Sequence, residues 1–74
     1  MPGQVEVLMD EVRRDQINEC FAQVTGLLED AHEIAVTGQS DRASLDELMD
    51  CAKALRQTVD RASAMVTVIE GLLS

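Results

Sequence analysis

Few residues of this 74-residue chain could carry out chemistry: two cysteines, one histidine and some adjacent carboxylates. Nucleophilic catalysis needs a Ser, Cys or similar group beside a base, and loop binding of phosphate needs clustered glycines. The sequence has no Ser/His/Asp grouping and no Gly-rich loop. Its adjacent acids, Glu29-Asp30 and Asp46-Glu47, fall on expected helix surfaces where no pocket is implied. We therefore expect a non-enzyme with no cofactor and no small-molecule substrate.

The single histidine, His32, is the one conceivable metal ligand of the imidazole type. In a hairpin that turns near residue 41, it would lie near Asp50 and Cys51, with Glu29 one helical turn before it. Zinc sites usually rest on CxxC or HxxxH pairs, which fix two ligands on one turn, and the chain has no such pair. We expect a solvated histidine and no bound metal.

The two cysteines are predicted to be too far apart for a bond within the chain. The same hairpin places Cys20 opposite residue 62 and Cys51 opposite residue 31. That separation is about eleven residues along the axis, or roughly 16 Å. A disulfide tolerates only about 4.4–6.8 Å between Cα atoms. We expect structural thiols in a reducing compartment, with a disulfide between subunits as the alternative.

Helix-breaking residues divide the chain nearly in half. The cluster Thr37-Gly38-Gln39-Ser40-Asp41 is flanked by helical patterns, and Gly38 suits the left-handed position after a helix end. Ser44 and Glu47 have the spacing of a capping box. The pattern predicts an all-α single domain over residues 1–74: an antiparallel, coiled-coil-like two-helix hairpin, completed by oligomerisation into a helical bundle. The expected bounds are a helix over 4–37, a turn over 38–43 and a helix over 44–73.

The strongest pattern is an apolar stripe along the second helix. Its members alternate at spacings of three and four residues, which is the a/d repeat of helices packed side by side. A matching but less regular stripe follows the first helix. We expect these two stripes to form the hairpin core: Ile17, Phe21, Val24, Leu28 and Ala31 from the first helix, and Leu45, Leu48, Ala52, Leu55, Val59, Ala62, Val66, Ile69 and Leu73 from the second.

A second apolar column runs beside the second-helix stripe at intervals of seven residues. A helix with one neighbour needs only a narrow stripe, so a wider apolar face indicates a second neighbour. The alternative is that the first helix covers both columns. We expect the extra column to bind a partner, together with Val68 and an N-terminal apolar group: Cys51, Thr58, Met65, Leu72, Val68, Val5, Leu8, Met9 and Val12. The polar run at residues 13–16 leaves open whether the first helix is continuous or broken there.

Composition and charge also favour a partner and exclude some kinds of partner. The net charge is −8, and Phe21 is the only aromatic residue, so the core is thin for the length. Small scaffolds of this make-up usually need disulfides, metal or oligomerisation. The negative field disfavours nucleic acid and anionic membranes. The chain shows no export signal and no membrane-length apolar run, so we expect a cytoplasmic location.

The second half of the chain resembles one family of small helical hairpins. Gly38 at the turn, the segment Ala52-Lys53-Ala54-Leu55 and the tail Val66, Val68 and Ile69 are similar to features of the E-component co-chaperones of type III secretion needles, the YscE, PscE and EscE group. The resemblance covers about the last 45 residues, and Leu45 stands where that group often carries an aromatic. It implies a cytoplasmic co-chaperone that joins a second chaperone and shields a needle subunit from polymerisation.

Three functional hypotheses follow from the sequence. The first is a protein–protein interaction module that binds partner helices, with the needle co-chaperone as one instance. The second is a homodimeric four-helix-bundle regulator. The third is a small acidic inhibitor of a host protein, of the kind that phages encode.

Overall fold

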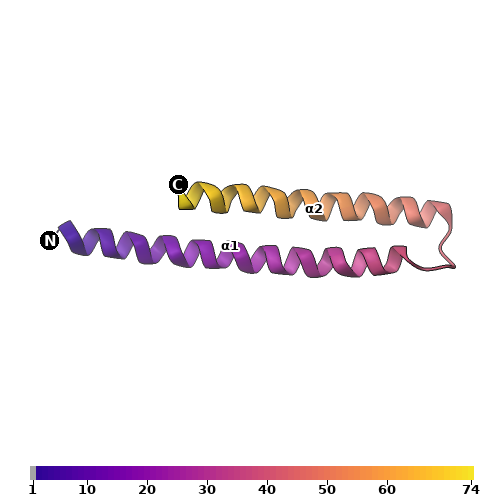
Figure 1. The fold of residues 1–74 in the computed structure, drawn as a ribbon, viewed down its shortest axis with the longest axis horizontal. Helices are drawn as coiled ribbons and strands as arrows, with labels where there is room; N and C mark the ends of the chain where they lie inside the picture. Colours follow the sequence, from indigo (N-terminus) through magenta and orange to yellow (C-terminus); the bar gives the residue numbers. More distant parts are fainter. Residues whose placement is uncertain (1) are drawn as a thin grey trace.

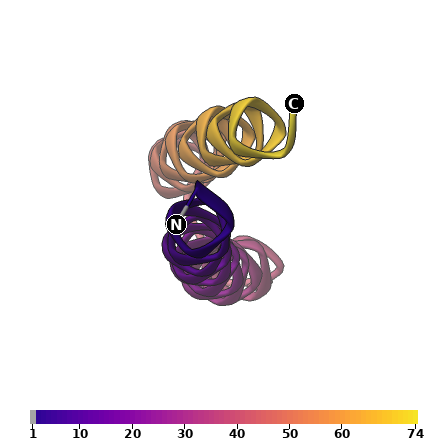
Figure 2. The ribbon, with the colours of Figure 1, turned by 90° about the vertical axis from the view of Figure 1, so that its left-hand side faces the viewer.

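The computed structural model describes the backbone of residues 2–74 and the side chains of residues 9–74. Helix α1 spans Pro2–Gly38 and helix α2 spans Leu45–Leu73, and they lie antiparallel as a long hairpin (Figure 1). The longest dimension is 65 Å and the other two are 15 and 11 Å. Viewed along the long axis, the helices wind across one another (Figure 2). The prediction of an all-α antiparallel hairpin is confirmed.

Helix α1 is continuous through the polar run at residues 13–16. That run is Arg13-Arg14-Asp15-Gln16, and Arg and Gln are good helix formers with neither a proline nor a glycine nearby. The run therefore changes which side of the helix is apolar without interrupting the backbone hydrogen bonds. Of the two alternatives that the sequence left open, the single helix is the one observed.

Helix α2 begins at the predicted cap. Ser44 has extended backbone angles (φ −72°, ψ 164°), and its hydroxyl accepts a hydrogen bond from the Glu47 amide at 3.1 Å. The Ser44 carbonyl accepts the first helical bond, from the Leu48 amide, at 2.9 Å. Asp46 and Glu47 in the first turn also oppose the positive end of the helix dipole. Local chemistry therefore fixes this boundary within one residue of the prediction.

The connection between the helices differs from the prediction at Gly38. In the part of the chain that the structure describes, no glycine has a positive φ, so the expected left-handed position is wrong. Gly38 is the last residue of α1. The helix end is closed by two hydrogen bonds, which the Gln39 amide donates to the Val36 carbonyl and the Ser40 amide donates to the Thr37 carbonyl. A Cβ atom at Gly38 would lie 3.8 Å from the Cβ of Cys51, so this glycine faces α2 directly.

This contact shows how the two helices are aligned along their axes. Gly38 lies opposite Cys51, so the first six residues of α2, from Leu45 to Asp50, project beyond the end of α1 (Figure 1). The sequence analysis had placed residue 31 opposite Cys51, which is about seven residues, or about 10 Å, away. That alignment assumed a symmetrical turn, whereas residues 39–44 carry the chain outward along the axis. At the other end, α1 extends beyond the end of α2 (Figure 1).

The half-buried and buried side chains define the seam between the helices. Apart from Gly26, Ala35 and Ala54, which are also half-buried, they recur at three- and four-residue spacings in both helices, as a and d positions of an antiparallel coiled coil do. Among the described side chains, only Ala62 and Ile69 expose less than a tenth of their surface, 8% and 4% respectively. The seam comprises Ile17, Cys20, Val24, Leu27, Ala31, Ile34 and Gly38 from α1, and Leu48, Cys51, Leu55, Thr58, Ala62, Met65, Ile69 and Leu72 from α2.

The observed seam differs from the predicted hairpin core. The structure places Ile17, Val24 and Ala31 of α1 in the seam, with Leu48, Leu55, Ala62 and Ile69 of α2, as expected. The remaining predicted core residues are exposed: Phe21, Leu28, Leu45, Ala52, Val59, Val66 and Leu73. In both helices the seam uses the neighbouring apolar column instead. The physical reason is a rotation of each helix by about 50° around its axis, which exchanges one column of a heptad for the next.

Candidate helix-binding face

Most of the displaced core residues lie with Ala35 on one side of the seam, on a surface that we call the open apolar face. In an antiparallel coiled coil the e positions of the two helices lie on the same side of the seam, and all of these residues occupy e positions. One surface hollow confirms the geometry, because it is lined by Phe21 together with Leu72 and Leu73. The open apolar face comprises Phe21, Leu28 and Ala35 from α1, and Ala52, Val59, Val66 and Leu73 from α2.

Five side chains of this face are large and exposed. Phe21 is 52% exposed, Leu28 55%, Val59 47%, Val66 43% and Leu73 64%. Single exposed apolar residues are ordinary on protein surfaces, but a contiguous two-row patch usually marks an interaction site. Leu45, 84% exposed, continues the α2 row past the end of α1. An α-helix laid against these two rows would find apolar contacts along about 30 Å of the hairpin.

The rows that border this face carry little charge. On the α1 side they are Asn18, Thr25 and His32, all exposed and uncharged when the histidine is neutral. On the α2 side they are Met49, Arg56, Ser63 and Glu70, which sum to no net charge. Charged side chains nevertheless line two hollows on this side: Asp10, Arg13 and Arg14 lie beside Phe21 and Leu73, and Glu29 and Glu33 lie beside Leu28.

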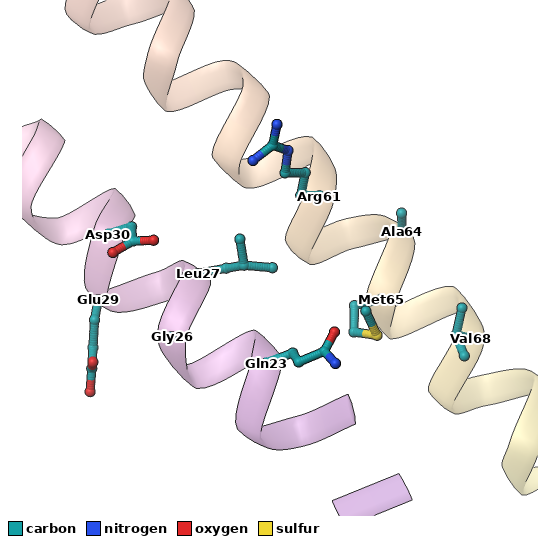
Figure 3. Close-up of a pocket in the computed structure, with 9 residues that line it drawn as sticks. All are labelled: Gln23, Gly26, Leu27, Glu29, Asp30, Arg61, Ala64, Met65 and Val68. Carbon is teal, nitrogen blue, oxygen red and sulfur yellow. The ribbon is translucent and has the colours of Figure 1, made fainter. Parts of the chain in front are cut away.

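The opposite side of the hairpin carries another groove, which we call the g-side groove. It has a volume of about 630 Å³ and lies between α1 and α2 (Figure 3). Leu27 points from α1 toward α2, while Glu29 points away (Figure 3). Its lining mixes apolar and ionisable groups: Gln23, Gly26, Leu27, Glu29, Asp30, Arg61, Ala64, Met65 and Val68.

The predicted partner-binding residues are not brought together by the structure. Cys51, Thr58, Met65 and Leu72 are half-buried in the seam, where α1 covers them. The alternative, that the first helix covers both columns, holds for this column alone, because Ala52, Val59 and Val66 of the main stripe are exposed. The Thr58 hydroxyl donates to the Ala54 carbonyl at 2.9 Å, which satisfies the one polar side chain of the α2 seam internally.

The other predicted partner-binding residues are scattered. Val68, 49% exposed, lines the g-side groove. Met9 and Val12, at 61% and 52%, lie where α1 extends beyond α2. The side chains of Val5 and Leu8 lie outside the described residues.

The chemically capable residues stay separate. Cys20 and Cys51 are free thiols. With Gly38 opposite Cys51, Cys20 lies opposite Ile69, so the two thiols are about 18 residues, or about 27 Å, apart along the axis. Among the residues that the structure describes, no three His, Cys, Asp or Glu side chains cluster as a metal site would require. His32 is exposed.

The sequence did carry a sign of the open apolar face, although it did not identify its members. Each helix has three apolar heptad columns, and two are enough for a two-helix seam. One column of each helix therefore had to remain outside. Cys20, Leu27 and Ile34 form the α1 column that the prediction left out, and they are the residues that replace Phe21 and Leu28 in the seam.

Comparison with protein-family models, curated proteins and solved structures finds no match to this chain. Within residues 2–74, neither helix combines the length and apolar character needed to cross a membrane.

Proposed function

We propose that this protein is a non-enzymatic interaction module, which binds helices of another chain on the open apolar face and thereby completes a helical bundle. The observation that supports this most strongly is the exposure of Phe21, Leu28, Val59, Val66 and Leu73 on one side of the seam. A helical occupant suits the face because its two rows run straight along the helices for several turns. Two-helix hairpins usually gain a second apolar layer in this way.

The charge distribution supports a protein partner over other ligands. A net charge of −8 disfavours phosphate backbones and anionic lipid surfaces. The face itself is apolar, and its border rows have no basic cluster of the kind that nucleic-acid binding uses. The co-chaperone role that the sequence resemblance implies stays a prediction within this class. In that role, the bound helices would come from a second chaperone and from the needle subunit.

A matched pair of substitutions tests the proposal. Val59→Lys places a charge at the centre of the open apolar face, and Val68→Lys makes the same change in the g-side groove. The two valines have nearly equal exposure, 47% and 49%, and both lie on α2. The tagged chain is purified from its native cells, and the mass and composition of its complex are measured.

We expect the wild-type chain and the Val68→Lys variant to be recovered in the same complex, and the Val59→Lys variant to be recovered without it. Chemical cross-links of the wild-type complex from Lys53, which follows Ala52 of the face along α2, should join a helix of the bound chain. Recovery of the wild type as a free monomer, or loss of the complex only in Val68→Lys, would contradict the proposal.

A further inference from the structure

Helix α1 carries two adjacent apolar columns, and only one of them lies in the seam. Cys20, Leu27 and Ile34 are half-buried in the seam, whereas Phe21 and Leu28, each one residue further along the chain, are exposed on the open apolar face. The exposed pair is at least as apolar as the seam residues beside it. Exchanging the two columns would therefore cost little hydrophobic burial on α1.

The same arrangement recurs on α2, on the same side of the seam. Thr58 and Met65 are half-buried in the seam, whereas Val59 and Val66, the next residues, are exposed. The valines carry no polar group, so moving them into the seam would leave no buried donor or acceptor without a partner. Both helices therefore hold a spare apolar column on the side of the open apolar face.

One concerted movement would exchange the two sets of columns. Adjacent heptad columns are about 50° apart around a helix axis, so rolling both helices inward by that angle brings the open apolar face into the seam. With Gly38 opposite Cys51, Ala31 lies opposite Thr58. After the roll Ala31 would lie opposite Val59, which requires the helices to slide by one residue, or about 1.5 Å. Residues 39–44 lie between the two helices in the chain and would take up this slide.

The most buried residues would stay between the helices throughout such a roll. Ala62 and Ile69, the least exposed of the described side chains, occupy the a positions of α2, between its seam and exposed columns. Val24 and Ala31 hold the equivalent place on α1. The roll therefore pivots on contacts that both arrangements share, and it needs no unfolding of either helix.

No polar contact between described residues holds one helix to the other in its present rotation. Buried polar side chains are a usual means of fixing the alignment of a coiled coil, but none of the buried side chains that the structure describes is polar. The side-chain hydrogen bonds among residues 9–74 each join groups at most four positions apart. Thr58 is bonded to the Ala54 carbonyl of its own helix and would keep that bond after the roll.

From these observations we propose that the hairpin is a two-state device, whose helices roll together between the observed open form and a closed form. In the closed form Phe21, Leu28, Val59 and Val66 pack between the helices, and the present d columns face the g-side groove. Packed interfaces of this kind favour discrete arrangements over intermediate ones. The roll itself goes beyond the proposed function. Its use as a control of partner binding rests on that function, because a helix bound to the open apolar face would hold the open form.

Leu27 and Leu28 provide a matched test, because they are adjacent and of one type but only Leu27 lies in the seam. Leu27→Glu places a charge in the open form's seam, and Leu28→Glu places it in the closed form's seam. Two thiols report the state of the full-length chain through their rates of alkylation by iodoacetamide under native conditions. One is Cys51 in a chain with Cys20→Ala, and the other is introduced by Val66→Cys in a chain with Cys20→Ala and Cys51→Ala.

We expect Leu27→Glu to change the two alkylation rates in opposite directions. Cys51 leaves the seam in the closed form and should react severalfold faster, whereas the thiol at position 66 enters the seam and should react severalfold more slowly. Leu28→Glu should leave Cys51 at or below its unsubstituted rate. Unfolding would expose both thiols, so only a roll can produce opposite changes. Any result in which Leu27→Glu does not change the two rates in opposite directions would overturn the inference.

These measurements need no partner, so they are decided separately from the proposed function. Opposite rate changes without any complex recovered from the native cells would leave the roll intact and overturn the helix-binding role. A complex that is lost on Val59→Lys and kept on Val68→Lys, without opposite rate changes, would overturn the roll and leave the helix-binding role intact.

Discussion

Ile69 offers the most direct test of the seam, since it is the least exposed apolar side chain that the structure describes, at 4%. Ile69→Ala removes three carbon atoms from contact with α1. At about 0.8 kcal/mol for each buried methylene-sized group, the transfer loss is roughly 2–3 kcal/mol, before any term for the cavity. Chains of this size rarely have more than about 3–5 kcal/mol of stability in total. The substitution should therefore remove half or more of it.

Urea denaturation followed by circular dichroism at 222 nm measures this loss. With a slope near 1 kcal/mol per molar urea, typical of small proteins, the midpoint should fall by about 2 M. Val36→Ala is the matched control, because Val36 is 52% exposed on the side of α1 that faces away from α2. Its midpoint should stay the same or rise slightly, since alanine has the higher helix propensity. If both variants lowered the midpoint equally, the seam described here would not be the core.

Three further predictions follow from local features of the hairpin. Ser44→Ala should cost about 1 kcal/mol in urea unfolding because it removes the side-chain cap of α2, whereas Ser63→Ala in mid-helix should cost nothing; equal losses would argue against the cap. Gly26→Ala should raise the unfolding free energy by roughly 0.5–1 kcal/mol, since a Cβ there meets no atom within 4 Å; a fall in the midpoint would show a contact that the structure lacks. Treatment with diamide should form no intrachain bond between Cys20 and Cys51, and alkylation after unfolding should label both thiols; a single-chain disulfide would require a different alignment of the helices.

The helix ends were predictable because they depend on neighbouring residues. Ser44 lies three residues before Glu47, and the amide of Glu47 bonds to the Ser44 hydroxyl as the capping pattern predicts. The end of α1 was found within one residue, although for a different reason. Gly38 was expected to adopt a left-handed conformation, but it is helical and packs against Cys51 on the facing helix, where an added Cβ would lie at ordinary contact distance. That contact joins residues 13 positions apart, which local rules do not describe.

The candidate site was harder to predict than the helices. Val59 and Val66 belong to the most regular apolar repeat in the chain, and for that reason they were assigned to the core, yet each is more than two-fifths exposed. Met65, assigned to a partner, lies in the seam. A repeat shows that a column is apolar, but not whether its neighbour is the other helix of the hairpin or another chain.

The sequence alone therefore determined two helices, their bounds, their antiparallel order and an apolar surface wider than one neighbour can cover. Each of these follows from periodicity, capping and the position of helix breakers, which are properties of residues a few positions apart. Only the tertiary structure decided the rotation of each helix about its axis and the alignment along it. A rotation of each helix by about 50° around its axis brings the adjacent heptad column into the seam. The two columns that are exchanged are almost equally apolar, so the hydrophobic pattern does not favour either one. That rotation is what leaves Phe21, Leu28, Val59, Val66 and Leu73 open.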